Sequence, residues 1–92
     1  MKKSALITGF GEHTPAIAPD AFVDSFVRII GQVTIGSRAS IWPGCVLRAD
    51  DDAITVAAGA VVLDLALVEA PAGHPVHIGE GALVSHKACV HG

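Results

Sequence analysis

The chain is poor in charged residues, which limits the classes of ligand it can bind. Only 16% of its 92 residues are charged, and the formal net charge is −3. A protein that grips the phosphate backbone of a nucleic acid needs clustered lysine and arginine. The sequence offers no such basic patch, so nucleic acid is not expected as a partner.

Long apolar runs are also missing. No stretch approaches the roughly 20 apolar residues that a membrane-spanning helix requires, so no membrane partner is expected. Residues 5–10 follow a basic start but are too short for the apolar core of a signal peptide, about 7–15 residues long. The two cysteines, Cys45 and Cys89, are predicted to be small apolar fillers in a reducing, cytoplasmic compartment and not a disulfide.

What the sequence does contain is a six-residue repeat of branched apolar residues, here called anchors. The beat slips once by three residues and once by four. Small or β-branched residues recur four positions after the anchors, with Asp51 at the first slip as the exception. A short fixed period of this kind is typical of a solenoid. The anchors are Ile17, Val23, Ile29, Ile35, Ile41, Leu47, Val56, Val62, Val68, Ile78, Val84 and Val90.

The repeat predicts an all-β fold, a parallel β-solenoid of about four coils. Each hexapeptide would form a short strand and a turn, and three would close a triangular coil with the anchors inside. Stacked coils would lie about 4.8 Å apart, the spacing of hydrogen-bonded strands. We expect a single domain over residues 1–92, with residues 1–16 as a lead-in and 17–92 as coils. Because a chain this short buries only about 60% of its unfolded surface and is 51% hydrophobic, partner subunits are expected to cover part of it.

Three segments resemble the γ-class carbonic anhydrase-like family. Residues 35–50 (IGSRASIWPGCVLRAD) resemble its tryptophan-containing repeat, and residues 75–86 and 90–92 resemble its later repeats. The resemblance implies a left-handed parallel β-helix, a hand that spacing alone does not give. It also implies a homotrimer with zinc or iron between subunits and reversible CO2 hydration. The family's further coils and C-terminal helix are not expected within these residues. We expect the open fourth coil to meet a second trimer end to end, or to be covered by another subunit's segment.

The resemblance also implies the metal ligands. The family uses three histidines, two from one subunit and one from its neighbour. His86 and His91 match two of them, and Glu69 stands where the family has the third. From the repeat, Glu69 and His91 should stack on the third face of coils three and four, while His86 points to a different edge. Two histidines and a glutamate form a legitimate zinc set, although the carboxylate would leave a water in the open position less acidic.

An alternative needs no metal. Arg48 is expected directly below Glu69 in the same column, where the two can form an ion pair. Arg48, Asp50 and Asp64 match the family's arginine and aspartates. We interpret these three first as ties between subunits and second as catalytic residues, with Arg48 attracting an anion. Leu63 replaces the family's glutamine and cannot orient water, which predicts weak or absent catalysis.

The remaining polar residues carry weaker signals. His74 and His77 are expected to be exposed in the longer loop at the second slip. Asp50, Asp51 and Asp52 are interpreted as a solvated turn and not a calcium loop, and Trp42 as packing at an interface. Three functions stay open: a γ-carbonic anhydrase-like enzyme of low activity, a non-catalytic trimeric scaffold, and a hexapeptide acyltransferase using acyl-CoA. The tryptophan-containing motif and the scarcity of basic residues argue against the last.

Overall fold

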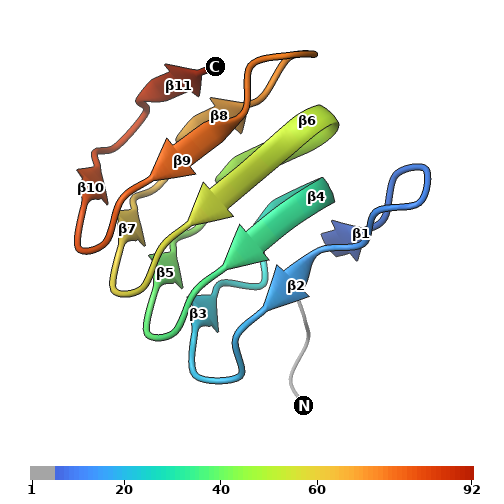
Figure 1. The fold of residues 1–92 in the computed structure, drawn as a ribbon. Coiled ribbons are helices and arrows are strands. Elements are labelled where there is room, and N and C mark those ends of the chain that lie inside the picture. The colour runs from blue at the N-terminus through green and yellow to red at the C-terminus, as the bar shows by residue number, and fades with distance from the viewer. Residues whose placement is uncertain (1–5) are drawn as a thin grey trace.

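The computed structural model describes residues 6–92, so the start of the predicted lead-in, residues 1–5, lies outside the described part. The chain winds into a left-handed parallel β-helix of about four coils (Figure 1). No helix suitable for crossing a membrane is found in this range. The strands are β1 (Leu6–Thr8), β2 (Ala16–Ile17), β3 (Phe22–Val23), β4 (Arg28–Ile35), β5 (Ser40–Ile41), β6 (Val46–Val56), β7 (Val61–Val62), β8 (Leu67–Glu69), β9 (Val76–Ile78), β10 (Leu83–Val84) and β11 (Cys89–His91).

The coils present three flat faces. The second face is a sheet of β3, β5, β7 and β10, and the third is formed by β1, the first halves of β4 and β6, β8 and β11. The first face consists of β2, the second halves of β4 and β6, and β9. We call the turn after the first face the first corner, that after the second face the second corner, and the passage from the third face to the first the third corner.

The predicted columns of anchors are confirmed by the strand register. On the second face, Val23 pairs with Ile41, Ile41 with Val62, and Val62 with Val84. The other two faces repeat this arrangement, and the columns are Ile17–Ile35–Val56–Ile78 and Ile29–Leu47–Val68–Val90. Each branched side chain therefore stacks on its counterpart one coil away.

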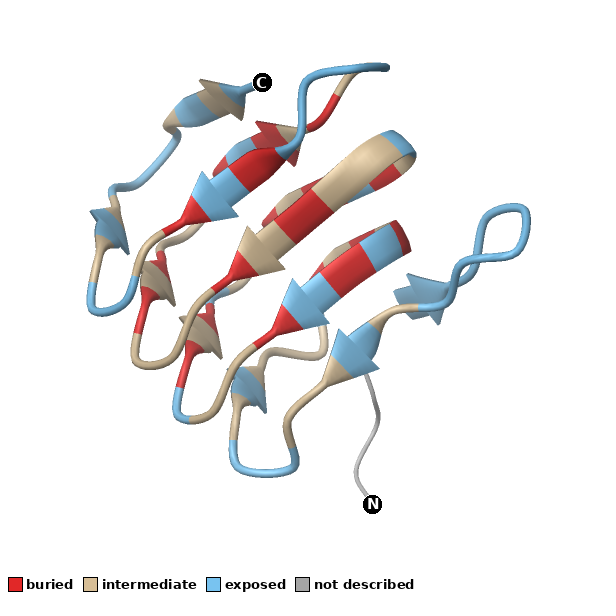
Figure 2. Cartoon of the chain, in the orientation of Figure 1, coloured by how far each residue is buried: buried red, intermediate tan, exposed pale blue. Residues whose placement is uncertain are grey.

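These columns form the core. The anchors of coils two and three are at most 1% exposed, whereas Val84 and Val90 of coil four are only partly covered. Figure 2 shows the buried positions concentrated in the middle coils. Removing a Val or Ile side chain from water contributes about 1.5–3 kcal/mol, so the central coils hold most of the stabilising burial. Among residues 6–92, no polar or charged residue is classed as buried.

The first slip corrects one expectation. Asp50, Asp51 and Asp52 were expected in a turn, but they lie inside β6, which curls around the third corner (Figure 1). The register passes from Gly31–Ala49 to Val33–Ile54, so four residues of β6 oppose one residue of β4. These three extra residues are the slip. Gly31 has a φ of +84°, and any Cβ there would clash with the carbonyl of Ala49.

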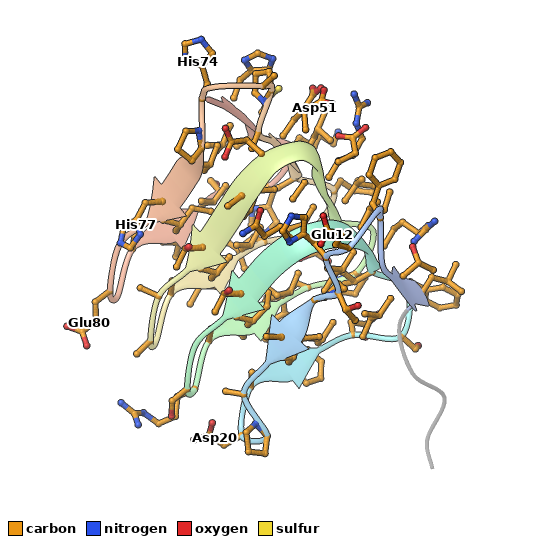
Figure 3. The ribbon with its side chains drawn as sticks, turned by 45° about the vertical axis from the view of Figure 1, so that its right-hand side comes forward. Glu12, Asp20, Asp51, His74, His77 and Glu80 are labelled. Carbon is orange, nitrogen blue, oxygen red and sulfur yellow. The ribbon has the colours of Figure 1, made fainter. Side chains whose placement is uncertain are left out.

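The positions of the loop histidines and of the two cysteines agree only in part with the sequence-based predictions. His74 lies in the loop at the second slip, but His77 lies in β9 and pairs with Thr55; both are exposed, and Figure 3 shows them on different elements. Cys45 is buried, as predicted for a filler, whereas Cys89 is exposed on β11. Cys89 precedes anchor Val90 and pairs with Leu67, which is also exposed, so this column of side chains points away from the core.

The lead-in contributes a strand of its own. β1 pairs with β4 through Ile7–Ile29 and extends the third face by one strand. Arg28 fixes it, because its Nη1 donates to Thr8 Oγ1 at 2.8 Å. Residues 6–8 thus belong to the solenoid, although the repeat assigned them to the lead-in.

Candidate metal site

Three polar side chains stack in one column on the third face. The register pairs Arg48 of β6 with Glu69 of β8, and Glu69 with His91 of β11. Arg48 Nη2 donates to Glu69 Oε2 at 2.7 Å, and His91 Nε2 lies 3.8 Å from Glu69 Oε1. The predicted stacking of these three residues is confirmed.

Asp50 completes the environment of Arg48. The Nε of Arg48 donates to Asp50 Oδ1 at 3.3 Å. This hydrogen bond, with the charges of Asp50 and Glu69, raises the pKa of the guanidinium above its ordinary value. The side chain of Arg48 remains 44% exposed and that of Glu69 only 20%. Arg48 therefore stays charged, with part of its surface open to a further anion or carboxylate.

The ring of His91 has a second contact that matters for ligation. Its Nδ1 lies 3.1 Å from the carbonyl oxygen of Gly92. If Nδ1 carries the proton and donates to this oxygen, Nε2 keeps a lone pair and faces Glu69. A backbone carbonyl on the far nitrogen is the usual way in which a metal-binding histidine is oriented.

His86 and Asp64 lie elsewhere, at the second corner. Both occupy the second position after an anchor, on adjacent coils, and His86 Nε2 is 4.0 Å from Asp64 Oδ1. Both side chains are well exposed, at 64% and 45%. Within the described part of one chain, no three His, Cys, Asp or Glu side chains gather closely enough to hold a metal. A single chain thus brings Glu69 and His91 together but not His86.

The third corner holds a contact that the sequence did not reveal. Asp52 Oδ2 accepts the backbone N–H of Gly73 at 2.9 Å, and Oδ1 accepts that of Ala53 at 2.8 Å. Asp52 thereby ties the second-slip loop (residues 71–75) to β6. The carbonyl of His74 in this loop leaves no room for a Cβ at Gly92. The loop therefore packs against Gly92, whose carbonyl oxygen contacts His91 Nδ1.

Leu63 and Cys45 meet at the second corner. The thiol of Cys45 donates to the carbonyl oxygen of Leu63 at 3.0 Å, and burial raises the pKa of the thiol. A protonated, buried thiol is unreactive, so Cys45 is a packing residue and not a nucleophile. Trp42 contacts Phe22, with ring centroids 4.9 Å apart, and its Nε1 donates to Ser40 Oγ at 3.0 Å.

The sequence of this chain is similar to those of known proteins. The family model described as bacterial transferase hexapeptide (six repeats) matches residues 15–49. "Gamma carbonic anhydrase 1, mitochondrial" of Arabidopsis thaliana is 36% identical over 87 residues, covering 88% of this chain. The chain belongs to the γ-class carbonic anhydrase-like family. A carbonic anhydrase of Geobacillus kaustophilus is 32% identical over 86 residues, covering 94% of this chain.

The family's fold is shared by solved structures. A hexapeptide transferase family protein of Anaplasma phagocytophilum superposes with a TM-score of 0.88 at 34% identity, covering 94% of this chain and 50% of that one. A candidate acetyltransferase of Bacillus cereus superposes with a TM-score of 0.92 at 28% identity, covering 96% and 51%. This γ-class chain spans 32% of the Arabidopsis relative and 47% of the Geobacillus relative.

The residues on the third face fit part of a metal site of the kind the family implies. Two zinc ligands at about 2.0–2.1 Å in a tetrahedral site lie roughly 3.3 Å apart, close to the 3.8 Å between Glu69 Oε1 and His91 Nε2. A carboxylate and an imidazole are both zinc donors. The donor set is therefore sound but incomplete within one chain.

Proposed function

We propose that this chain assembles as a homotrimer and binds a zinc or iron ion between copies. Glu69 and His91 of one chain and His86 of the next would hold the metal. The observation that carries the proposal is the 3.8 Å approach of His91 Nε2 to Glu69 Oε1, with His86 exposed on another edge where only a second copy can use it. The compartment we propose is the cytoplasm.

We further propose that the assembled site catalyses reversible CO2 hydration slowly. When bound, the metal supplies a Lewis acid that lowers the pKa of a water molecule and makes it a nucleophile toward CO2. As a ligand, Glu69 would bring a negative charge that a third imidazole lacks, and this charge would keep the pKa of the bound water higher. Leu63 is half-buried and apolar, so it can neither orient water nor accept a proton.

Arg48, Asp50 and Asp64 surround this site in separate roles. Arg48 is held by Asp50 and Glu69 and still has an exposed edge. Asp64 is exposed at the second corner, so it can reach the exposed guanidinium of a neighbouring copy. We assign Arg48, Asp50 and Asp64 first to subunit contact, and Arg48 second to attracting bicarbonate.

The test is stopped-flow CO2 hydration by zinc-loaded wild type, Glu69→His and the double variant Glu69→His/Leu63→Gln. We expect a low rate for wild type, a higher rate for Glu69→His, and a further gain with glutamine at position 63. A matched control, Glu80→His, introduces the same imidazole at the exposed first corner and should change nothing. Equal rates for all four proteins would contradict the proposed site.

One observation favours a second candidate, a trimeric scaffold without metal. The 2.7 Å ion pair between Arg48 and Glu69 satisfies the carboxylate without a cation from solution. In that case the trimer forms normally, no metal is retained after incubation with zinc, and Glu69→His gives no activity. Metal analysis of the purified trimer separates the two candidates.

A further inference from the structure

Leu65 has a backbone conformation that leucine normally avoids. Its φ is +66°, in the left-handed region where Cβ of a non-glycine residue crowds the backbone. It is the third residue after anchor Val62 at the second corner. Gly44 holds the equivalent place one coil earlier with a φ of +82°, and Lys87 one coil later with a φ of +62°. Glycine at position 65 would fit this turn without strain.

Contacts within the chain only partly compensate this strain. The side chain of Leu65 lies over Gly44, where an added Cβ would come within 2.5 Å of Leu65 Cδ2. Even so, Leu65 remains 58% exposed. A strained residue persists where its surroundings or its function require it, and an exposed leucine gains little from the solvent around it.

Leu65 is accompanied by other exposed apolar side chains at or next to the second corner. Phe26, at the equivalent turn position two coils earlier, is 80% exposed, and Leu67 on β8 is 36% exposed. Asp64 and His86 form a polar rim beside them. An exposed apolar surface rimmed by polar groups marks an interaction site, so this corner has the composition of an interface.

The charges around this surface point to a second copy of the chain as its partner. The corner side carries the exposed carboxylate of Asp64, and the third face carries the exposed guanidinium of Arg48 next to the apolar Val46 and Leu67 column. Corner and third face are thus complementary in both charge and polarity. Packing the corner of one copy on the third face of the next makes a head-to-tail contact, the kind of contact that forms a closed ring such as a trimer when the rotation between copies closes.

We propose that Leu65 is the central contact residue with which the second corner of one copy docks on the third face of the next, against Val46 and Leu67. The inference rests on the proposed trimer, because the same contact carries His86 toward Glu69 and His91 of the neighbouring copy. It adds a reason for leucine at this turn: the strain is retained because the side chain is buried on assembly. A few buried contact residues of this kind usually account for most of the binding free energy of an interface.

The test compares Leu65→Gly with Lys87→Gly. Both substitutions relieve a left-handed backbone at the same corner, but only the first removes an apolar side chain. Sedimentation velocity over a concentration series should show that Leu65→Gly weakens association by about tenfold or more, while Lys87→Gly associates within about twofold of wild type. Leu65→Met, which keeps the apolar bulk, should restore association, and Leu65→Asn, which tolerates this φ, should not.

Circular dichroism of each variant checks that the β-helix is folded. Unchanged association of folded Leu65→Gly, or wild type that sediments as a monomer throughout, would overturn the inference. Assembly that depends on Leu65 in a protein retaining no zinc would leave the inference intact and refute only the metal-dependent function. Zinc binding in a trimer whose association is unchanged by Leu65→Gly would support the metal site and refute the inference about Leu65.

Discussion

Arg48 and Glu69 are joined by a 2.7 Å hydrogen bond between Nη2 and Oε2, one coil apart on the third face. The other carboxylate oxygen, Oε1, faces His91 at 3.8 Å. The two interpretations of Glu69, ion-pair partner and metal ligand, therefore use different oxygens. In the proposed metal site, Arg48 would orient the carboxylate for ligation through the opposite oxygen, as outer-shell partners of metal ligands commonly do.

Substituting Glu69 by Gln tests this shared role. The amide keeps the shape but loses the charge, so both the ion pair and the ligand are weakened. We expect zinc affinity to fall by more than the roughly 10–100-fold that loss of an outer partner costs, measured by competition with a chromogenic chelator. Asp51→Asn removes one negative charge from the same region at an exposed position and should leave zinc affinity almost unchanged. Similar losses in both variants would mean that only net charge matters.

Asp52 is predicted to hold the second-slip loop in place. Asp52→Ala removes the acceptor of the Gly73 and Ala53 amides, and hydrogen bonds to a charged group contribute about 1.5–3 kcal/mol each. We expect a lower free energy of unfolding and faster hydrogen exchange at the Gly73 amide. The neighbouring Asp51→Ala should exchange as wild type does at Gly73. An unchanged Gly73 amide in Asp52→Ala would contradict the contact.

Asp20 gives the chain a pH-dependent contribution to stability. The hydroxyl of Ser37 donates to its Oδ2 at 2.7 Å and the backbone N–H of Arg38 to Oδ1 at 3.3 Å, which lowers the pKa of Asp20 in the folded state. A carboxyl whose pKa falls on folding stabilises the fold above its unfolded pKa. That contribution is lost as pH falls through the folded pKa.

The expected outcome is that Asp20→Asn is less stable than wild type at pH 7. The difference should shrink as acid protonates Asp20 in the wild type. Denaturant titrations at neutral pH and at about pH 3, below the ordinary pKa of aspartate, measure it. A difference that stays constant over this range would show that the hydrogen bonds, and not the charge, are responsible.

Truncating an anchor is expected to destabilise the fold more in a central coil than in coil four. Val62 is completely buried, whereas Val84, its partner one coil later, is only partly buried. Val62→Ala should lower the free energy of unfolding by about 2–3 kcal/mol through lost burial and a cavity, and Val84→Ala by clearly less. Denaturant unfolding of the matched pair checks this. Equal losses would show that coil four is covered as fully as the central coils.

The regular part of the fold could be predicted from the sequence because a six-residue period leaves few alternatives. Pairs such as Val23–Ile41 and Glu69–His91 follow from counting residues along the anchors. The position and length of the slips also follow from this counting, but the conformation of the inserted residues does not, because they carry no period. Asp50, Asp51 and Asp52 were expected in a turn and instead continue β6 around the corner.

Other features depend on contacts between residues far apart in the chain. The role of Asp52 depends on Gly73, 21 residues later, and nothing near Asp52 in sequence signals it. Leu65 was not recognised as unusual because leucine is an ordinary core residue, and only the observed φ reveals its strain. Whether His86 meets Glu69 and His91 depends on a second copy, which the fold of one chain does not contain.

The most direct test of the proposed site is zinc content after co-expression of two defective variants. His86→Ala chains keep Glu69 and His91, and His91→Ala chains keep His86, so each variant alone should retain almost no zinc. Mixed trimers would contain interfaces with all three ligands intact, and the account predicts that zinc per chain recovers in the co-purified mixture. Zinc that stays at the level of the single variants, while wild type retains it, would contradict a metal site shared between copies.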